Sequence, residues 1–92
     1  MKFEIEHERD IIGNQIRVVV STEGDQRISC VSTEVDNFPA GNDPLIPPAR
    51  QYRRTWRKQG QAGPGREHTV RVTATGQDGN QESAVEQWQD AS

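Results

Sequence analysis

Two histidines and a single cysteine are the side chains of this sequence best suited to nucleophilic or metal chemistry. His7 and His68 lie near opposite ends of the chain with Cys30 between them, so no metal-ligand spacing is present. A catalytic Cys30–His68 pair would have to be assembled by the fold. No serine lies in a nucleophile elbow, and the glycines of the 60–65 segment lack the Lys and Ser/Thr of a phosphate loop. The pattern argues against an enzyme.

These three residues also have structural interpretations. We expect Cys30 to be a buried, inert thiol, because its neighbours are apolar and a lone cysteine cannot form a disulfide within its own chain. We expect both histidines to point toward the core, with His68 hydrogen-bonded to a loop carbonyl.

Asp78, Asn80 and Glu82 alternate around Gly79 in a spacing that faintly resembles a calcium loop. Such a loop needs more oxygen ligands and a bidentate carboxylate at its end. A plain hairpin turn explains the same residues, so we expect no metal site and no cofactor.

The most informative chemical feature is a basic segment within a chain of net charge −3. Residues 1–49 carry four basic and nine acidic side chains, residues 50–71 seven and one, and residues 72–92 none and four. Cations interleave there with two aromatic residues: Arg50, Tyr52, Arg53, Arg54, Trp56, Arg57 and Lys58. Arginine beside exposed aromatic rings is typical of a surface that recognises acidic protein, polysaccharide or nucleic acid.

The basic segment has a second interpretation, in which its charges serve the fold. If Tyr52 and Trp56 point inward, Arg53 and Arg57 lie on the outer face. Arg54 then has to reach the surface or pair with an acid, and neighbouring acidic strands could neutralise the whole set. The sequence alone leaves both interpretations open.

The elements that carry these residues are expected to be strands. Ile and Val number 14, whereas Leu and Met occur once each, and β-branched side chains suit pleated sheets. Apolar and polar residues alternate over six segments: 2–8, 14–22, 28–32, 51–58, 66–75 and 81–88. The second and third segments flank turn residues and are predicted to form a hairpin, with Ile28, Cys30 and Ser32 on one face.

Between Asp36 and Ala49 the alternation disappears, and four prolines remove backbone donors. We expect a long crossing loop there, with room for a short edge strand around Leu45 and Ile46. The whole pattern predicts an all-β, antiparallel immunoglobulin-like sandwich of six to seven strands, forming a single domain over residues 1–92 with a frayed tail at 89–92.

The segment from Gly63 to Asn80 resembles the last hairpin of bacterial immunoglobulin-like and polycystic-kidney-disease-like (fibronectin III-like) sandwich modules. In those families a glycine precedes an aromatic residue, alternating Thr and Val follow, and an Asp-Gly-Asn turn closes the hairpin. His68 stands where such modules often carry a tyrosine that anchors the corner. The resemblance implies the fold, with binding at a cell surface or appendage as a family habit.

We therefore expect a non-catalytic binding or structural module that recognises a protein or carbohydrate partner through its loops and a basic strand face. The candidate binding residues are Arg50, Arg53, Arg54, Arg57, Lys58, Phe38 and Leu45. The alternative is a small cytoplasmic nucleic-acid-binding protein that uses the Arg50–Lys58 strand, although a pI near 5.3 argues against it.

No segment predicts membrane insertion, because the longest apolar run is Val18–Val20 and the Met1–Glu6 opening has no hydrophobic signal region. A complete chain would then be cytoplasmic, whereas a domain trimmed from a longer protein could be extracellular or on the cell surface. Exposed edge strands make strand-to-strand pairing conceivable, and the sequence leaves the oligomeric state open.

Overall fold

The computed structural model describes residues 1–9, 13–59 and 67–89, without the side chains of residues 9, 13, 14, 57–59, 88 and 89. None of the described residues forms a helix that could cross a membrane. Seven strands occupy the described ranges: β1 (Lys2–Arg9), β2 (Gly13–Ser21), β3 (Ile28–Val35), β4 (Phe38–Ala49), β5 (Gln51–Gln59), β6 (Glu67–Gly76) and β7 (Gln81–Gln89).

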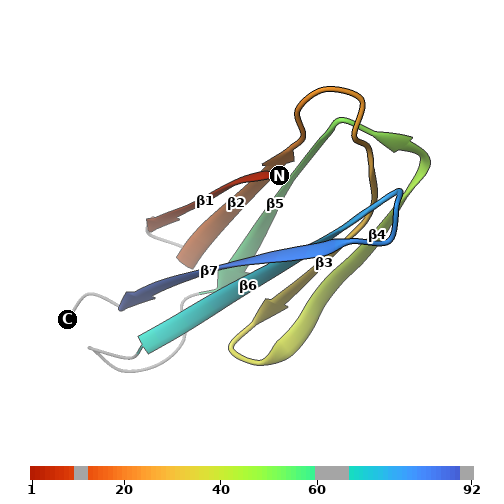
Figure 1. The fold of residues 1–92 in the computed structure, drawn as a ribbon. Helices are drawn as coiled ribbons and strands as arrows, with labels where there is room; N and C mark the ends of the chain where they lie inside the picture. Colours follow the sequence, from red (N-terminus) through yellow and green to blue (C-terminus); the bar gives the residue numbers. More distant parts are fainter. Residues whose placement is uncertain (10–12, 60–66, 90–92) are drawn as a thin grey trace.

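The strands form two antiparallel sheets that pack face to face (Figure 1). Sheet A has the order β1-β2-β5, and sheet B has the order β4-β3-β6-β7. The predicted antiparallel sandwich of six to seven strands is confirmed. Gln89, which we expected to begin a frayed tail, ends β7 opposite Glu67, and residues 90–92 lie outside the described part of the chain.

The core lies between the strands that have a neighbour on both edges. On β2 and β6 the period-2 pattern places every second side chain in the interior, as predicted, because successive side chains of a strand point to opposite faces. Burying each of these Val and Ile side chains stabilises the fold by about 1.5–3 kcal/mol. The buried apolar residues are Ile16, Val18, Val20, Ile28, Val31, Tyr52, Val70, Val72 and Ala74.

A bulge at Ser29 changes the inner face of β3. Ile28 pairs with Gly76 and Cys30 pairs with Thr75, so Ser29 is an extra residue with no partner of its own on β6. The Ser29 hydroxyl donates to the carbonyl oxygens of Thr75 and Gly76, at 3.1 and 3.3 Å. One inserted residue moves every following side chain to the other face of the sheet.

The predicted inner face of β3 is therefore wrong beyond Ile28. Val31 and Thr33 are buried, whereas Cys30 and Ser32 are only half-buried. The Cys30 Sγ lies 3.1 Å from the side-chain oxygen of Asn42, on the neighbouring strand. The thiol is thus part of a polar outer face, and the expectation of a fully buried Cys30 is wrong.

The predicted hairpin between the second and third strands is also wrong. Both edges of β2 are occupied, by β1 and β5, so β2 cannot pair with β3. The connection crosses from sheet A to sheet B, with Gly24 at φ 64° and the Thr22 amide donating to the Arg50 carbonyl at 3.0 Å. Gly and Asp are common both in hairpin turns and in connections that cross from one sheet to the other. Turn residues alone therefore do not distinguish the two.

The expected crossing loop between Asp36 and Ala49 is mostly a strand. β4 is twelve residues long and forms one edge of sheet B, pairing only with β3. An edge strand uses the backbone donors of only one side, which lets proline remain in it. Asp36 and Asn37 form the reversal before β4, with φ angles of 53° and 68° that Asp and Asn tolerate better than most residues.

Candidate binding surfaces

The basic strand β5 is the free edge of sheet A, and its two faces differ as expected. Tyr52 is buried and Trp56 is half-buried against the core, whereas Arg53 is exposed on the outer face opposite Val19 of β2. Arg53 has no ion pair with any described residue. Arg57 and Lys58 lie further along β5, opposite Gln15 and Asn14, and their side chains are outside the described part.

Arg54 points to the inner side of β5 and pairs with an acid, one of the two outcomes expected for it. Its Nη1 donates to both carboxylate oxygens of Asp43 on β4, at 2.7 and 2.6 Å. The Tyr52 hydroxyl donates to the same carboxylate. The Arg54 guanidinium also lies over the Trp56 ring, 4.9 Å from its centroid, in a cation–π contact.

This Asp43–Tyr52–Arg54 cluster joins the edges of the two sheets. The hydroxyl of Tyr52, and next the guanidinium of Arg54, hold the pKa of the Asp43 carboxyl below its usual value. Burial, together with the hydrogen bond to Asp43, raises the pKa of Tyr52. Both shifts favour a neutral phenol beside an ionised carboxylate, so Arg54 is held by Asp43 while part of its side chain stays exposed.

The other predicted binding residues lie at different places. Arg50 is exposed between β4 and β5 and forms a loose ion pair with Asp25, at 3.6 Å. Phe38, at the start of β4, is 74% exposed. Leu45 is half-buried and packs against the core, so the exposed side chain in this part of β4 is its neighbour Ile46, at 89%.

Sequence reasoning missed Ile46 because the segment was expected to be a loop. The alternation of β4 from Asp43 to Ile46 could have identified it, since one face of a strand holds Asp43 and Leu45 and the other holds Pro44 and Ile46.

The fold does not bring Cys30 and His68 together. Cys30 pairs with Thr75, and His68 lies seven residues earlier on β6, which corresponds to roughly 23 Å along a strand. The His68 ring is buried, and its Nδ1 lies 2.8 Å from Oδ2 of Asp36, a side-chain carboxylate rather than the predicted loop carbonyl. His7 is half-buried on β1.

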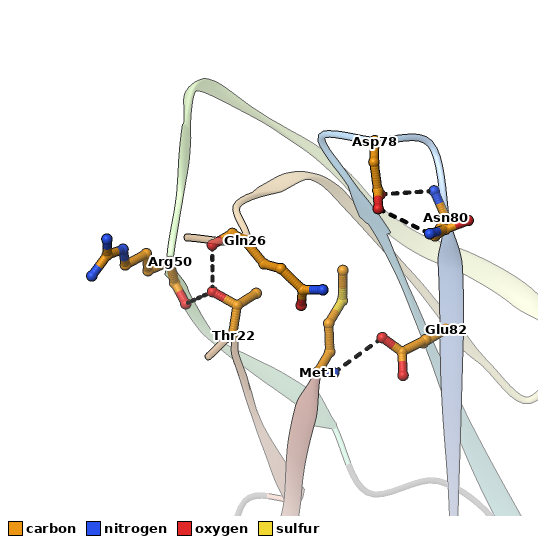
Figure 2. Close-up of polar contacts among 7 residues, drawn as sticks. All are labelled: Met1, Thr22, Gln26, Arg50, Asp78, Asn80 and Glu82. Atoms are coloured by element: carbon orange, nitrogen blue, oxygen red, sulfur yellow. Dashed lines mark hydrogen bonds and ion pairs between the residues drawn. The ribbon is translucent and has the colours of Figure 1, made fainter. Parts of the chain in front are cut away.

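An open groove of about 770 Å³ lies where Met1 meets the β2–β3 connection and the β6–β7 turn. Figure 2 shows the Met1 side chain between Gln26 and this turn, and the Met1 ammonium on the carboxylate of Glu82, 3.0 Å away. Arg50 points away from the groove (Figure 2). Most of the charged lining is acidic, from Asp25, Asp78 and Glu82.

Of the residues that faintly resembled a calcium loop, Asp78 and Asn80 lie in the β6–β7 turn and Glu82 lies in β7. The Asp78 carboxylate accepts hydrogen bonds from the backbone and side-chain nitrogens of Asn80, at 3.1 and 2.9 Å (Figure 2). Both carboxylate oxygens are thereby used within the turn, in the manner of an Asx turn. Among the described residues, no three His, Cys, Asp or Glu side chains come together in a way that could hold a metal ion.

Neither a family model nor a curated protein matches this sequence. Among solved structures, the chain is similar to one described as "Structures of Clostridium thermocellum CbhA fibronectin(III)-like modules". The two share 18% identity and a TM-score of 0.55, over 98% of this chain and 97% of the other. The chain thus has the fibronectin III-like, immunoglobulin-like sandwich fold that its last hairpin predicted.

Proposed function

We propose that the chain is a non-catalytic binding module that holds an acidic protein or acidic polysaccharide on the outer side of β5. The observation that carries this proposal is the position of β5 at an edge of sheet A. Its single strand neighbour, β2, contains no acidic residue, and Arg53 lines a small pocket with Glu4 and Glu6 of β1 without forming an ion pair with either.

Five cations and no acid lie between residues 50 and 59. The Asp43–Tyr52–Arg54 cluster uses one of them internally, and the exposed pair between Arg50 and Asp25 is weak in water. Arg53 has the clearest access to a ligand. Arg57 lies four residues further along the same strand.

Arg54 has a positioning role in this proposal. Its contacts with Asp43 and Trp56 fix the middle of β5 against β4, so the outward cations are held on a rigid strand. A rigid cationic surface loses little conformational entropy when a polyanion binds.

The test is an NMR titration of the protein with heparin and with polyglutamate at low and physiological salt. We expect amide shifts centred on β5 and a loss of affinity of about tenfold or more as salt rises, because ion pairing with a polyanion releases counterions. Arg53→Glu is expected to weaken binding, and Arg71→Glu, an exposed arginine on the outer face of sheet B, is the matched control.

Equal weakening by the two variants would refute a site on β5. The absence of shifts with both polyanions would also refute it. Mixed-sequence single-stranded DNA is the third arm, and tighter binding of DNA than of both other polymers would favour the nucleic-acid alternative instead.

A further inference from the structure

The four edge strands differ in how far they are protected against pairing with another strand. β4 carries prolines at 39, 44, 47 and 48, which cannot donate a backbone hydrogen bond. β5 has an inward-pointing charge at Arg54, and β1 alternates Lys2, Glu4 and Glu6 on its exposed face. Prolines and charges of this kind are the usual protection of a sheet edge.

β7 is protected by charge of one sign alone. It is nine residues long, contains no proline, glycine, lysine or arginine, and pairs on one side with β6. Its two charges, Glu82 and Glu86, lie on the inward side of the strand, aligned with the buried Ala74 and Val70. Such charges disfavour most added strands but match a strand of opposite charge. The other edge of β7 pairs with no strand in the described part of the chain. The backbone groups on that edge are therefore available to an added strand.

The side chains of β7 define which strand would fit. Glu82 and Glu86 lie on one face, opposite Ala74 and Val70 of β6, and about 13 Å apart along the strand. Val85 is on the other face and is 48% exposed. Glu86 is exposed and has no ion pair with any described residue.

The part of the sequence that forms β7 supplies no cation to these carboxylates. Residues 72–92 contain no basic residue. The charge of β7 is therefore complementary to a segment with cations at alternate positions.

We propose that the free edge of β7 binds an extended polypeptide segment that carries Lys or Arg at alternate positions, which adds to sheet B as a fifth strand. Backbone hydrogen bonds hold the segment, its cations lie beside Glu82 and Glu86, and an apolar residue between them covers Val85. This site is separate from the β5 surface, at the opposite edge of the fold.

A second copy of this chain does not fit the same edge through its own β7. Antiparallel pairing of two β7 strands would set Glu82 of one copy opposite Glu86 of the other in one register and diagonally across from it in the next, and like charges on facing strands destabilise a sheet. The charge pattern thus selects a basic partner strand.

The test uses a capped nine-residue peptide of alternating Lys and Val as the probe. We expect amide shifts and slower amide hydrogen exchange confined to β7. Two control peptides separate the contributions: Glu in place of Lys removes the charge complementarity, and Pro in place of the central Val removes a backbone donor. Neither control peptide is expected to bind.

Glu86→Lys is expected to raise the dissociation constant of the Lys–Val peptide about threefold to tenfold, as the charge pair becomes a repulsion. Glu23→Lys makes the same charge change at an exposed position of the β2–β3 connection and is expected to leave binding within about twofold.

Several results would overturn the proposal. These are shifts centred on β1 instead of β7, equal effects of the two variants, unchanged binding by the proline peptide, or a dimer of the free protein that uses β7. A folded Glu86→Lys variant with unchanged peptide affinity would also refute it, and its amide spectrum shows directly whether it is folded.

Discussion

The sandwich has two narrow sides, and they use charge in opposite ways. β4 and β5 together carry four basic and one acidic residue, whereas β1 and β7 carry two basic and five acidic residues. On the β4/β5 side an arginine is turned inward and bonded to a carboxylate of the other sheet. On the β1/β7 side the carboxylates stay exposed, and the terminal ammonium supplies the contact between the sheets.

The difference shows that the sign of a charged strand says little about its contribution to stability. A charge stabilises the fold when it is partly desolvated and hydrogen-bonded, as at Asp43, and does little when it is surrounded by water, as at Glu86. Substitution of a charged residue is therefore expected to cost more stability on the β4/β5 side than on the β1/β7 side.

The largest expected effect is from Asp43→Ala. It removes the acceptor of both Tyr52 and Arg54, and we expect a loss of about 2 kcal/mol in the free energy of unfolding, limited by partial solvent exposure. Urea unfolding measures it. Glu86→Ala is the control on the β1/β7 side and is expected to stay within about 0.5 kcal/mol. Similar losses in the two variants would contradict the proposed difference between the sides.

A second test compares two glycines, one on each side. A Cβ at Gly76 would lie 2.7 Å from Oδ1 of Asp78, whose carboxylate caps the β6–β7 turn, so Gly76→Ala is expected to cost about 1–2 kcal/mol. A Cβ at Gly41 would lie 3.1 Å from Nη1 of Arg54, the far end of a flexible side chain. We expect Gly41→Ala to cost less than Gly76→Ala in thermal unfolding, and the reverse order would contradict this reasoning.

The pH dependence of stability sharpens the comparison further. The pKa of Asp43 is lower in the folded chain than in the unfolded chain. The contribution of Asp43 to the free energy of unfolding is therefore fully present above its unfolded-state pKa, and it is lost as the pH falls through its folded-state pKa. Between pH 7 and pH 3 the free energy of unfolding of the wild type is expected to fall more than that of Asp43→Asn, as measured by urea unfolding. Tyr52→Phe, which removes one of the two hydrogen-bond donors to Asp43, is expected to lie between them.

At the alkaline end the sign is reversed. The pKa of Tyr52 is raised in the folded chain, so above pH 10 the unfolded chain loses the phenolic proton first. The wild type is then expected to become less stable as the pH rises, and Tyr52→Phe to lose less stability over the same range. If the free energy of unfolding changed with pH in the same way for the two proteins, the phenol would not be held by the cluster.

The smallest expected effect is at Thr33, in the core beside the β4/β5 side. The Thr33 hydroxyl is buried and has no hydrogen-bond partner in the described part of the chain. Thr33→Val keeps the shape and removes the unpaired hydroxyl, so we expect stability to be unchanged or up to about 1 kcal/mol higher. A clear loss of stability, measured by urea unfolding, would show that the hydroxyl is satisfied in solution.

Local patterns in the sequence predicted the strands that have a regular alternation. Val18 on β2 and Val72 on β6 follow from period 2 alone, and so do the two faces of β5. The partner of Arg54 could not be assigned in this way, because Asp43 belongs to the other sheet and lies on a segment that prolines made resemble a loop. Sheet pairing is decided by the whole fold, so turn residues could not show that β2 and β3 lie apart.

The bulge in β3 has a consequence for changes in chain length. Without Ser29, Ile28 would be followed directly by Cys30, and strict alternation would place Ile28, Val31 and Thr33 inward, as they are now. Deletion of Ser29 would forfeit its two hydroxyl hydrogen bonds but keep the core in phase. Removal of any single residue from 31 to 33 would instead put the rest of the strand out of phase. A deletion of one residue from β3 therefore keeps the same side chains in the core only when it is made at the bulge.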